Sequence, residues 1–123
     1  MAAAFGGYRQ VQRLALSGRH LQAEAFLTAA RRLDAFQDGR RQGTAYIRAL
    51  RFTHSLWSIV RADLSRPGNG APKALKEQIL SLSLFIEREI ARAVIDPAGA
   101  RIAAMVEVNR DIAAGLRPPV SPD

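Results

Sequence analysis

The sequence contains no cysteine, and that absence excludes disulfide bonds and thiolate metal sites. Long apolar runs are missing too. The richest, ILSLSLFI at residues 79–86, is far shorter than the roughly 20 residues that a membrane-spanning helix needs. The N-terminal MAAAFGGYRQ also lacks the basic and apolar regions of a signal peptide. We therefore expect a cytoplasmic protein that does not insert into a membrane.

Residues with catalytic or metal-binding chemistry are sparse. The only histidines, His20 and His54, have no partner at the spacing of a metal site or a catalytic triad. Glu87 and Glu89 are two residues apart, so on a helix they point to different sides and cannot work as an acid–base pair. We expect a protein that is not an enzyme, with no catalytic, cofactor-binding or metal-binding residues.

What is present is the composition of one helical domain. The chain has 123 residues, 48% hydrophobic and 24% charged, which suits a single globular domain over 1–123 with short flexible ends at about 1–4 and 117–123. Helix-forming residues dominate, and turn signals such as QDGRRQG, SRPGNGAP and DPAG interrupt them. The sequence predicts an all-α fold, a compact bundle of about five amphipathic helices. They are expected near residues 4–16, 20–38, 44–64, 72–95 and 97–114.

The last predicted helix places one polar side chain within its apolar face. That face comprises Ile102, Met105, Val106, Ile112, Ala113 and Leu116. Asn109 lies on the same face, where a buried amide without partners would cost roughly 1 to 3 kcal/mol. We interpret Asn109 as a structural residue that bonds to a neighbouring helix, with contact to a bound partner protein as the alternative. Candidate partners for its amide within the bundle are Thr53, Ser81 and Ser83. Arg110, about 100° around the helix, is the better candidate for contact with a partner protein.

Two other predicted helices carry candidate partner-binding residues. The third has a seam of Tyr46, Leu50, Thr53, Trp57, Val60 and Leu64 that should bury one face. We interpret Trp57 as a core residue or as the wall of a groove for a partner protein. The fourth has a seam of Leu75, Ile79, Leu82, Ile86 and Ile90. Outside that seam lie Leu80, Leu84 and Phe85. So wide an apolar surface indicates either a central helix or a second face for another protein.

The charge is unevenly distributed. Up to Pro67 the chain has eleven arginines against four acidic residues, which accounts for the whole net charge of +7. Arg40 and Arg41, with Arg48 and Arg51 nearby, form a candidate patch for an acidic partner, or else a solvated surface. RNA is not the favoured partner, because the aromatic residues lie in or near a helix seam and are not interleaved with the arginines.

Three segments occur together in a recognisable order: LRFTHSLWSIVRADLSRPGNGAP, ILSLSLFIEREIARAV and VEVNRDIAAGL. From about Tyr8 to Leu116 the chain resembles the FlaF family of flagellar biosynthesis regulators. Leu56, Asn109 and Gly115 fall within these segments, and the resemblance implies structural roles for them. The chain departs from the family pattern in two places. It has Thr53-His54 where the family has an Asn-Arg type of pair, and Gly70-Ala71 where the family has Pro-Leu.

The resemblance implies a non-enzymatic regulator of flagellar biosynthesis, a flagellin-binding chaperone or adaptor needed for flagellin synthesis and secretion. Flagellin is the implied partner, and FlbT is a second one that the face of Leu80, Leu84 and Phe85 would suit. The alternative is an RNA-associated post-transcriptional regulator of flagellin expression that acts with FlbT. The resemblance implies no cofactor.

Overall fold

The computed structural model describes residues 19–116 of the chain. Its elements are α2 (Arg19–Asp34), α3 (Thr44–Ser65), α4 (Lys73–Ile95), the short 3-10 helix η2 (Pro97–Gly99) and α5 (Ile102–Leu116). Four α-helices and no strand occur in this part of the chain, so the prediction of an all-α bundle is confirmed. The helix expected near 4–16 and the expected flexible ends lie outside the described residues.

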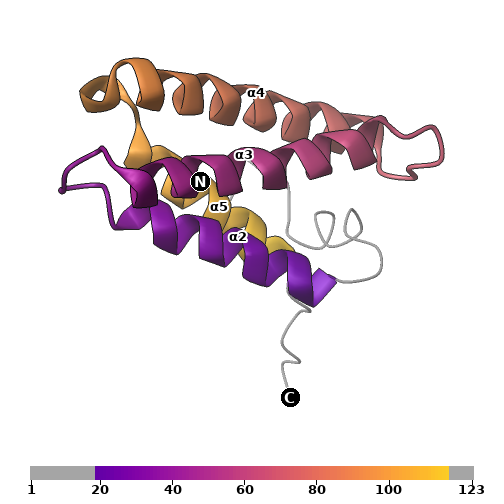
Figure 1. Cartoon of the computed structure of the whole chain (residues 1–123). Coiled ribbons are helices and arrows are strands. Elements are labelled where there is room, and N and C mark those ends of the chain that lie inside the picture. The colour runs from indigo at the N-terminus through magenta and orange to yellow at the C-terminus, as the bar shows by residue number, and fades with distance from the viewer. Residues whose placement is uncertain (1–18, 117–123) are drawn as a thin grey trace.

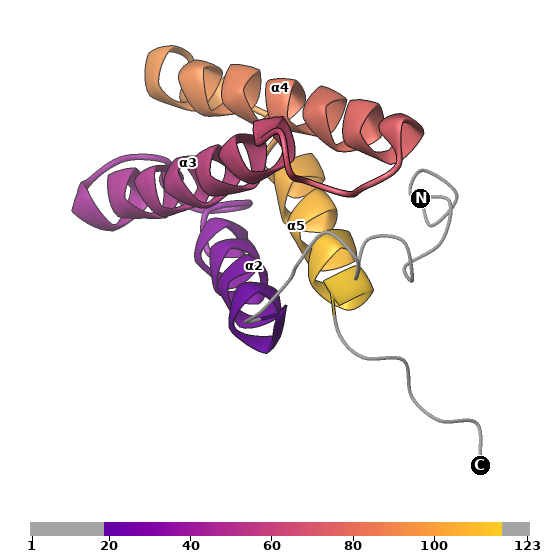
Figure 2. The same ribbon diagram turned by 90° about the vertical axis from the view of Figure 1, so that its right-hand side faces the viewer.

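The four helices form two layers (Figures 1 and 2). In one layer α3 and α4 make an antiparallel hairpin. In the other, α2 lies antiparallel to α5, although these are the first and the last of the described helices. Figure 2 shows the α3–α4 layer running across the α2–α5 layer. The α2–α5 pair has the most extensive backbone contact in the bundle. The core therefore lies between two helix pairs that cross.

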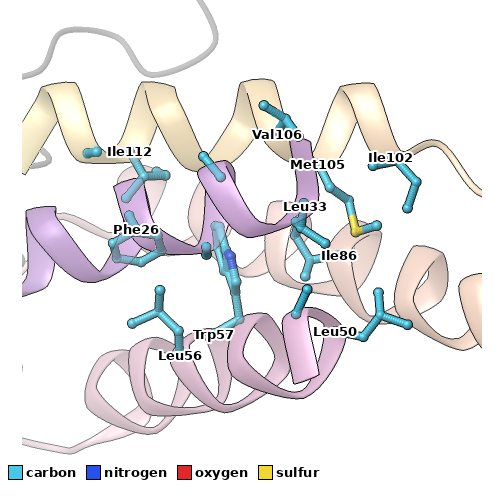
Figure 3. Packing of buried hydrophobic residues seen from close by; sticks show 14 of the residues in the cluster. Phe26, Leu33, Leu50, Leu56, Trp57, Ile86, Ile102, Met105, Val106 and Ile112 are labelled. Atoms are coloured by element: carbon cyan, nitrogen blue, oxygen red, sulfur yellow. The ribbon is translucent and has the colours of Figure 1, made fainter. Parts of the chain in front are cut away.

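Small side chains explain why α2 and α5 lie so close together. On the buried faces of these two helices are Ala23, Ala29, Ala30, Ala113 and Gly115. Because the side chains at a contact set the distance between helix axes, alanine and glycine bring the two backbones together. Larger residues of the same two helices are buried as well: Phe26, Leu33, Met105 and Ile112 (Figure 3).

The hydrophobic periodicity predicted the buried faces well. Every residue of the expected apolar face of α5 is buried, Asn109 included. The expected seam of α3 is also buried at Tyr46, Leu50, Thr53, Trp57 and Leu64, whereas Val60 is half-buried. In α4 the seam is buried at Leu75, Ile79 and Ile86, whereas Leu82 and Ile90 are half-buried. The faces on which the bundle depends could therefore be read from a repeat of three and four residues.

Two predicted helix boundaries are wrong. Helix α2 ends at Asp34 and not near residue 38, because the chain turns there, with the Phe36 N–H donating to the Leu33 carbonyl at 2.9 Å. The last helix begins at Ile102 and not at residue 97. Residues 97–99 form only a 3-10 turn, and Ala100 then has an extended backbone (φ −73°, ψ 141°) that stops this turn from continuing into α5.

A side chain from another helix determines where α5 begins. The carboxylate of Glu89, a buried residue of α4, accepts a hydrogen bond from the Arg101 N–H at 2.9 Å. A negative charge at this position satisfies a free backbone N–H and interacts favourably with the helix dipole. The Asp96 side chain, directly before Pro97, makes no capping hydrogen bond to η2. The start signal therefore lies on α4 and not in the local sequence.

Among the described residues, one buried hydrogen bond between side chains joins the two layers. Asn109 of α5 accepts it through Oδ1 from Trp57 Nε1 of α3 at 2.9 Å. The Asn109 Nδ2 donates to the Met105 carbonyl of its own helix at 2.8 Å. Trp57 also packs against the Phe26 ring of α2 edge to face, with 5.6 Å between ring centroids. This cluster brings together side chains of three helices at the centre of the bundle.

The interpretation of Asn109 as a tie to a neighbouring helix agrees with this bond, but the suggested partners were wrong. The Thr53 hydroxyl donates to the Ala49 carbonyl in its own helix at 2.9 Å. Ser81 is exposed, and the buried Ser83 hydroxyl has no hydrogen-bond partner. Trp57 was overlooked because an apolar seam residue was not considered as a donor, although a buried indole N–H usually finds an acceptor.

We predict that Asn109→Leu lowers the unfolding free energy by about 1 to 3 kcal/mol, because it leaves the Trp57 N–H buried without an acceptor. Trp57→Phe removes the indole N–H that donates this bond and replaces the indole by a smaller ring. Urea unfolding of both variants and of the double variant should show a coupling of about 0.5 to 3 kcal/mol. Thr53→Val, which breaks only a bond within α3, is the control. Additive effects of the two substitutions would show that the bond contributes nothing.

Candidate protein-binding surfaces

An apolar cavity lies beside the C-terminal half of α3, where all four helices meet. Its volume is about 60 Å³, several times the roughly 10 to 15 Å³ that one water needs. The walls include Phe26, Trp57, Val60, Ile79, Ile112 and Leu116. Ile59 also lines it and is 62% exposed, and Asp63 is the one charged lining residue in the described chain. The cavity can therefore accept an apolar group but gives water few partners.

Trp57 belongs to the core and to this cavity at once. Its side chain is 1% exposed, and its N–H is bound to Asn109, so the ring is fixed in place. Leu56 is buried beside it and lines the same space. A ligand would thus meet Trp57 as a rigid wall of the cavity and not as an exposed anchor.

The three apolar residues of α4 outside its seam do not form one exposed face. Leu84 is 55% exposed, whereas Leu80 and Phe85 are half-buried and pack against the core. The most exposed large apolar residue that the structure describes is Ile95, at the end of the same helix. The surface that α4 offers to a partner is therefore narrower than the sequence indicated.

Arg41 is separated from the other arginines of its predicted patch by its hydrogen bonds. Its Nε and Nη2 donate to the Phe36 and Gln37 carbonyls, both at 3.1 Å. Its Nη1 donates to the carbonyls of Pro97 at 2.7 Å and Ala100 at 3.0 Å. The guanidinium therefore joins the α2–α3 loop to the α4–α5 connection. These bonds take up Arg41, whereas Arg40, Arg48 and Arg51 are exposed.

Arg110 and Gly115 occupy different environments on α5. Arg110 is exposed, and its Nη2 lies 3.5 Å from Asp34 of α2, in an ion pair that water weakens. Gly115 is buried within the last turn of α5, which continues to Leu116. Leu56, Asn109 and Gly115 are thus all buried, as structural residues would be, and Arg110 is accessible to a partner.

Three polar links between helices had no signal in the local sequence. Glu89 holds the start of α5, as described above, and the Tyr46 hydroxyl donates to the Ala93 carbonyl of α4 at 2.8 Å. Arg61 of α3 binds both carboxylate oxygens of Glu87 on α4, at 2.5 and 3.0 Å. The hydrogen bonds from Arg61 hold the pKa of Glu87 below its ordinary value, and burial raises the pKa of Tyr46. All three links serve packing.

The described residues contain neither a cluster of metal ligands nor a membrane-spanning helix. Residues 19–116 contain no group of three or more His, Asp or Glu side chains that could hold a metal ion. None of the helices described is long and apolar enough to cross a membrane. Three surface features stand out in this part of the chain: the apolar cavity, the exposed residues of α4 and the arginines at the start of α3.

Comparison with known proteins identifies the family. The model of the family described as flagellar protein FlaF matches residues 4–116. The chain belongs to the FlaF family. No curated protein and no solved structure matches it. The family match covers all four described α-helices, so the cavity and the buried Trp57–Asn109 bond lie within a FlaF domain.

The two departures from the FlaF family pattern fall in different surroundings. At the first, Thr53 is buried with its hydroxyl bonded inside α3, and His54 is exposed. At the second, Gly70 and Ala71 lie in the α3–α4 loop, where Asn69 Oδ1 accepts a hydrogen bond from the Ala71 N–H at 2.9 Å. This Asx-type turn orders the loop without the proline that the family pattern has at position 70.

We predict that Arg41→Lys lowers the unfolding free energy by about 1 to 2 kcal/mol, because an ammonium group cannot reach all four carbonyls. Arg40→Lys is the matched control, since this neighbouring arginine is exposed. Both changes keep the charge, so thermal and urea unfolding measure the lost hydrogen bonds. Equal stability of the two variants would mean that the Arg41 contacts contribute little to the fold.

Proposed function

We propose that this FlaF-family protein is a non-enzymatic flagellin-binding chaperone or adaptor that is needed for flagellin synthesis and secretion. The observation that carries the proposal is the apolar cavity between the four helices, with exposed Ile59 at its edge. Membership of the FlaF family gives the flagellar context. Binding alone would suffice for this function, and no catalytic group is needed.

The chemistry of the cavity suits an amphipathic helix of a client. Flagellin has terminal helices whose apolar stripe is exposed until the filament assembles, and a helix of this kind binds by inserting apolar side chains into a groove. Here such a side chain would meet Trp57, Ile112 and Leu116, and Ile59 would pack against the client backbone. Each buried methylene would contribute about 0.8 kcal/mol.

The rim of the cavity supplies polar contacts without an uncompensated charge. Asp63 accepts hydrogen bonds from Arg66 at 2.8 Å and from the Asn69 amide at 3.1 Å. Its charge is thereby partly balanced within the domain. An apolar interior with a polar, hydrogen-bonded edge is the usual composition of a protein-binding site.

The alternative, an RNA-associated regulator acting with FlbT, has less support. Arg41 binds backbone carbonyls, and Phe36 and Phe52 are only half exposed, which leaves little surface for stacking bases. Contact with FlbT is a separate proposal: the exposed Leu84 and Ile95 of α4 are the residues that would make it.

We predict that Ile59→Glu weakens flagellin binding about tenfold or more, because it places a charge at the mouth of an apolar cavity. Isothermal titration calorimetry with flagellin that retains both terminal helices measures the effect. Val94→Glu is the matched control, since Val94 is 58% exposed and Ile59 62% exposed, both on α-helices. It should bind within about twofold of the unchanged protein.

The same titrations test the proposal itself. Flagellin without its terminal helices should not bind. The absence of binding to intact flagellin would overturn the chaperone proposal, and equal loss in the two variants would place the contact away from the cavity. Binding of flagellin messenger RNA or of FlbT in such titrations, without binding of flagellin, would favour the alternative function.

A further inference from the structure

A second surface lies at the other end of α3, where this helix meets α2 (Figure 1). Arg32 of α2 and Arg48 of α3 line one shallow depression there, together with Phe36 and Ala45. Arg48 and Arg51 line the adjoining depression with Ile47. This α2–α3 basic surface, defined by Arg32, Arg48 and Arg51, combines positive charge with an apolar floor.

The charge of this surface is not neutralised within the described chain. All three arginines are exposed, and none of the ion pairs within residues 19–116 includes them. The nearest acidic residue in sequence to Arg32 is Asp34, which pairs with Arg110 and also binds Gln37. No acidic residue lines either depression. An anionic partner would therefore find several donors without competition from a neighbouring carboxylate.

Two of the arginines are also spaced to pair with groups that repeat along a helical partner. Arg48 and Arg51 are three residues apart on one helix, so their side chains project from the same side one turn apart. The Arg32 guanidinium carbon lies 4.6 Å from the centroid of the Phe52 ring, a cation–π contact that limits its motion. Less conformational entropy is lost on binding when a donor is already held.

We propose that the α2–α3 basic surface binds an acidic, amphipathic helical segment of a partner protein. Carboxylates of the segment would pair with Arg32, Arg48 and Arg51, while its aliphatic side chains would lie on Ile47 and Ala45. This contact is separate from the cavity beside Trp57 and does not depend on flagellin binding.

A protein segment fits this surface better than RNA does. Single-stranded RNA needs exposed aromatic faces for stacking. The Phe52 face is covered by Arg32, and the half-buried Phe36 ring packs edge to face against Tyr46 at 5.2 Å between centroids. The remaining floor is aliphatic. Aliphatic side chains next to guanidinium groups match a helix that carries leucine and glutamate on the same side.

The test uses a fluorescent amphipathic peptide of about 18 residues, with glutamate and leucine on one face, and a twin in which every glutamate is glutamine. Fluorescence anisotropy at about 50 mM salt measures the binding of each to the full chain. The test variant is Arg48→Glu with Arg51→Glu. The matched control is Arg88→Glu with Arg92→Glu, two exposed arginines on α4 that give the same change in net charge.

We expect the acidic peptide to bind about tenfold more tightly than its glutamine twin, and the test variant to lose about tenfold in affinity. The control variant should stay within about threefold of the unchanged protein. Equal losses in the two variants would reduce the effect to general charge attraction and overturn the proposal. Tighter binding of a labelled uridine oligonucleotide of about 18 nucleotides than of the acidic peptide would also overturn it, because that result would assign the surface to nucleic acid.

Circular dichroism of each variant shows that the helices are intact. Arg48→Gln with Arg51→Gln repeats the test without introducing repulsion between like charges.

Discussion

The buried hydrogen bond between Trp57 and Asn109 fixes how α3 of one layer lies against α5 of the other. Helices α3 and α5 are not among the pairs with extensive backbone contact, so side chains must hold them together. Apolar packing alone permits small shifts of one layer over the other, whereas a donor and an acceptor in a dry core have one good alignment. Trp57 is also a wall of the apolar cavity, so the bond that aligns the layers gives the cavity a fixed shape.

Polar contacts outside the core position α5 for that bond. Glu89 accepts from the N–H of Arg101, directly before α5, and Arg41 donates to the carbonyls of Pro97 in η2 and of Ala100 just after it. Each links segments that are distant in sequence through a charged group and the backbone, where hydrogen bonds are stronger than between neutral groups. The short α4–α5 connection is therefore held by side chains from α4 and from the α2–α3 loop.

The sequence predicts the features that follow from helical periodicity, and it misses the contacts between residues that are distant along the chain. The apolar repeat identified the buried faces of α3 and α5, and it placed Asn109 among them. It could not show that Trp57 would be the partner, because two residues 52 positions apart have no spacing to reveal the contact. Arg41 was grouped with Arg40 for the same reason, since two of its carbonyl partners, Pro97 and Ala100, are more than 50 residues away. The sequence also did not show that Leu84 would be exposed while Leu80 and Phe85 are half-buried, because the exposure of a side chain on α4 depends on which helices pack around that helix.

The two proposed surfaces divide α3 between them. Ile59 and Trp57 lie by the apolar cavity, whereas Arg48 and Arg51 lie in the basic half. At 1.5 Å per residue, Arg48 and Ile59 are about 16 Å apart along the helix, too far for one side chain of a partner to touch both. A stiff helix with an apolar site near one end and a cationic site near the other can hold two segments of different chemistry at once. The order of residues along this single helix thus separates the apolar from the cationic surface.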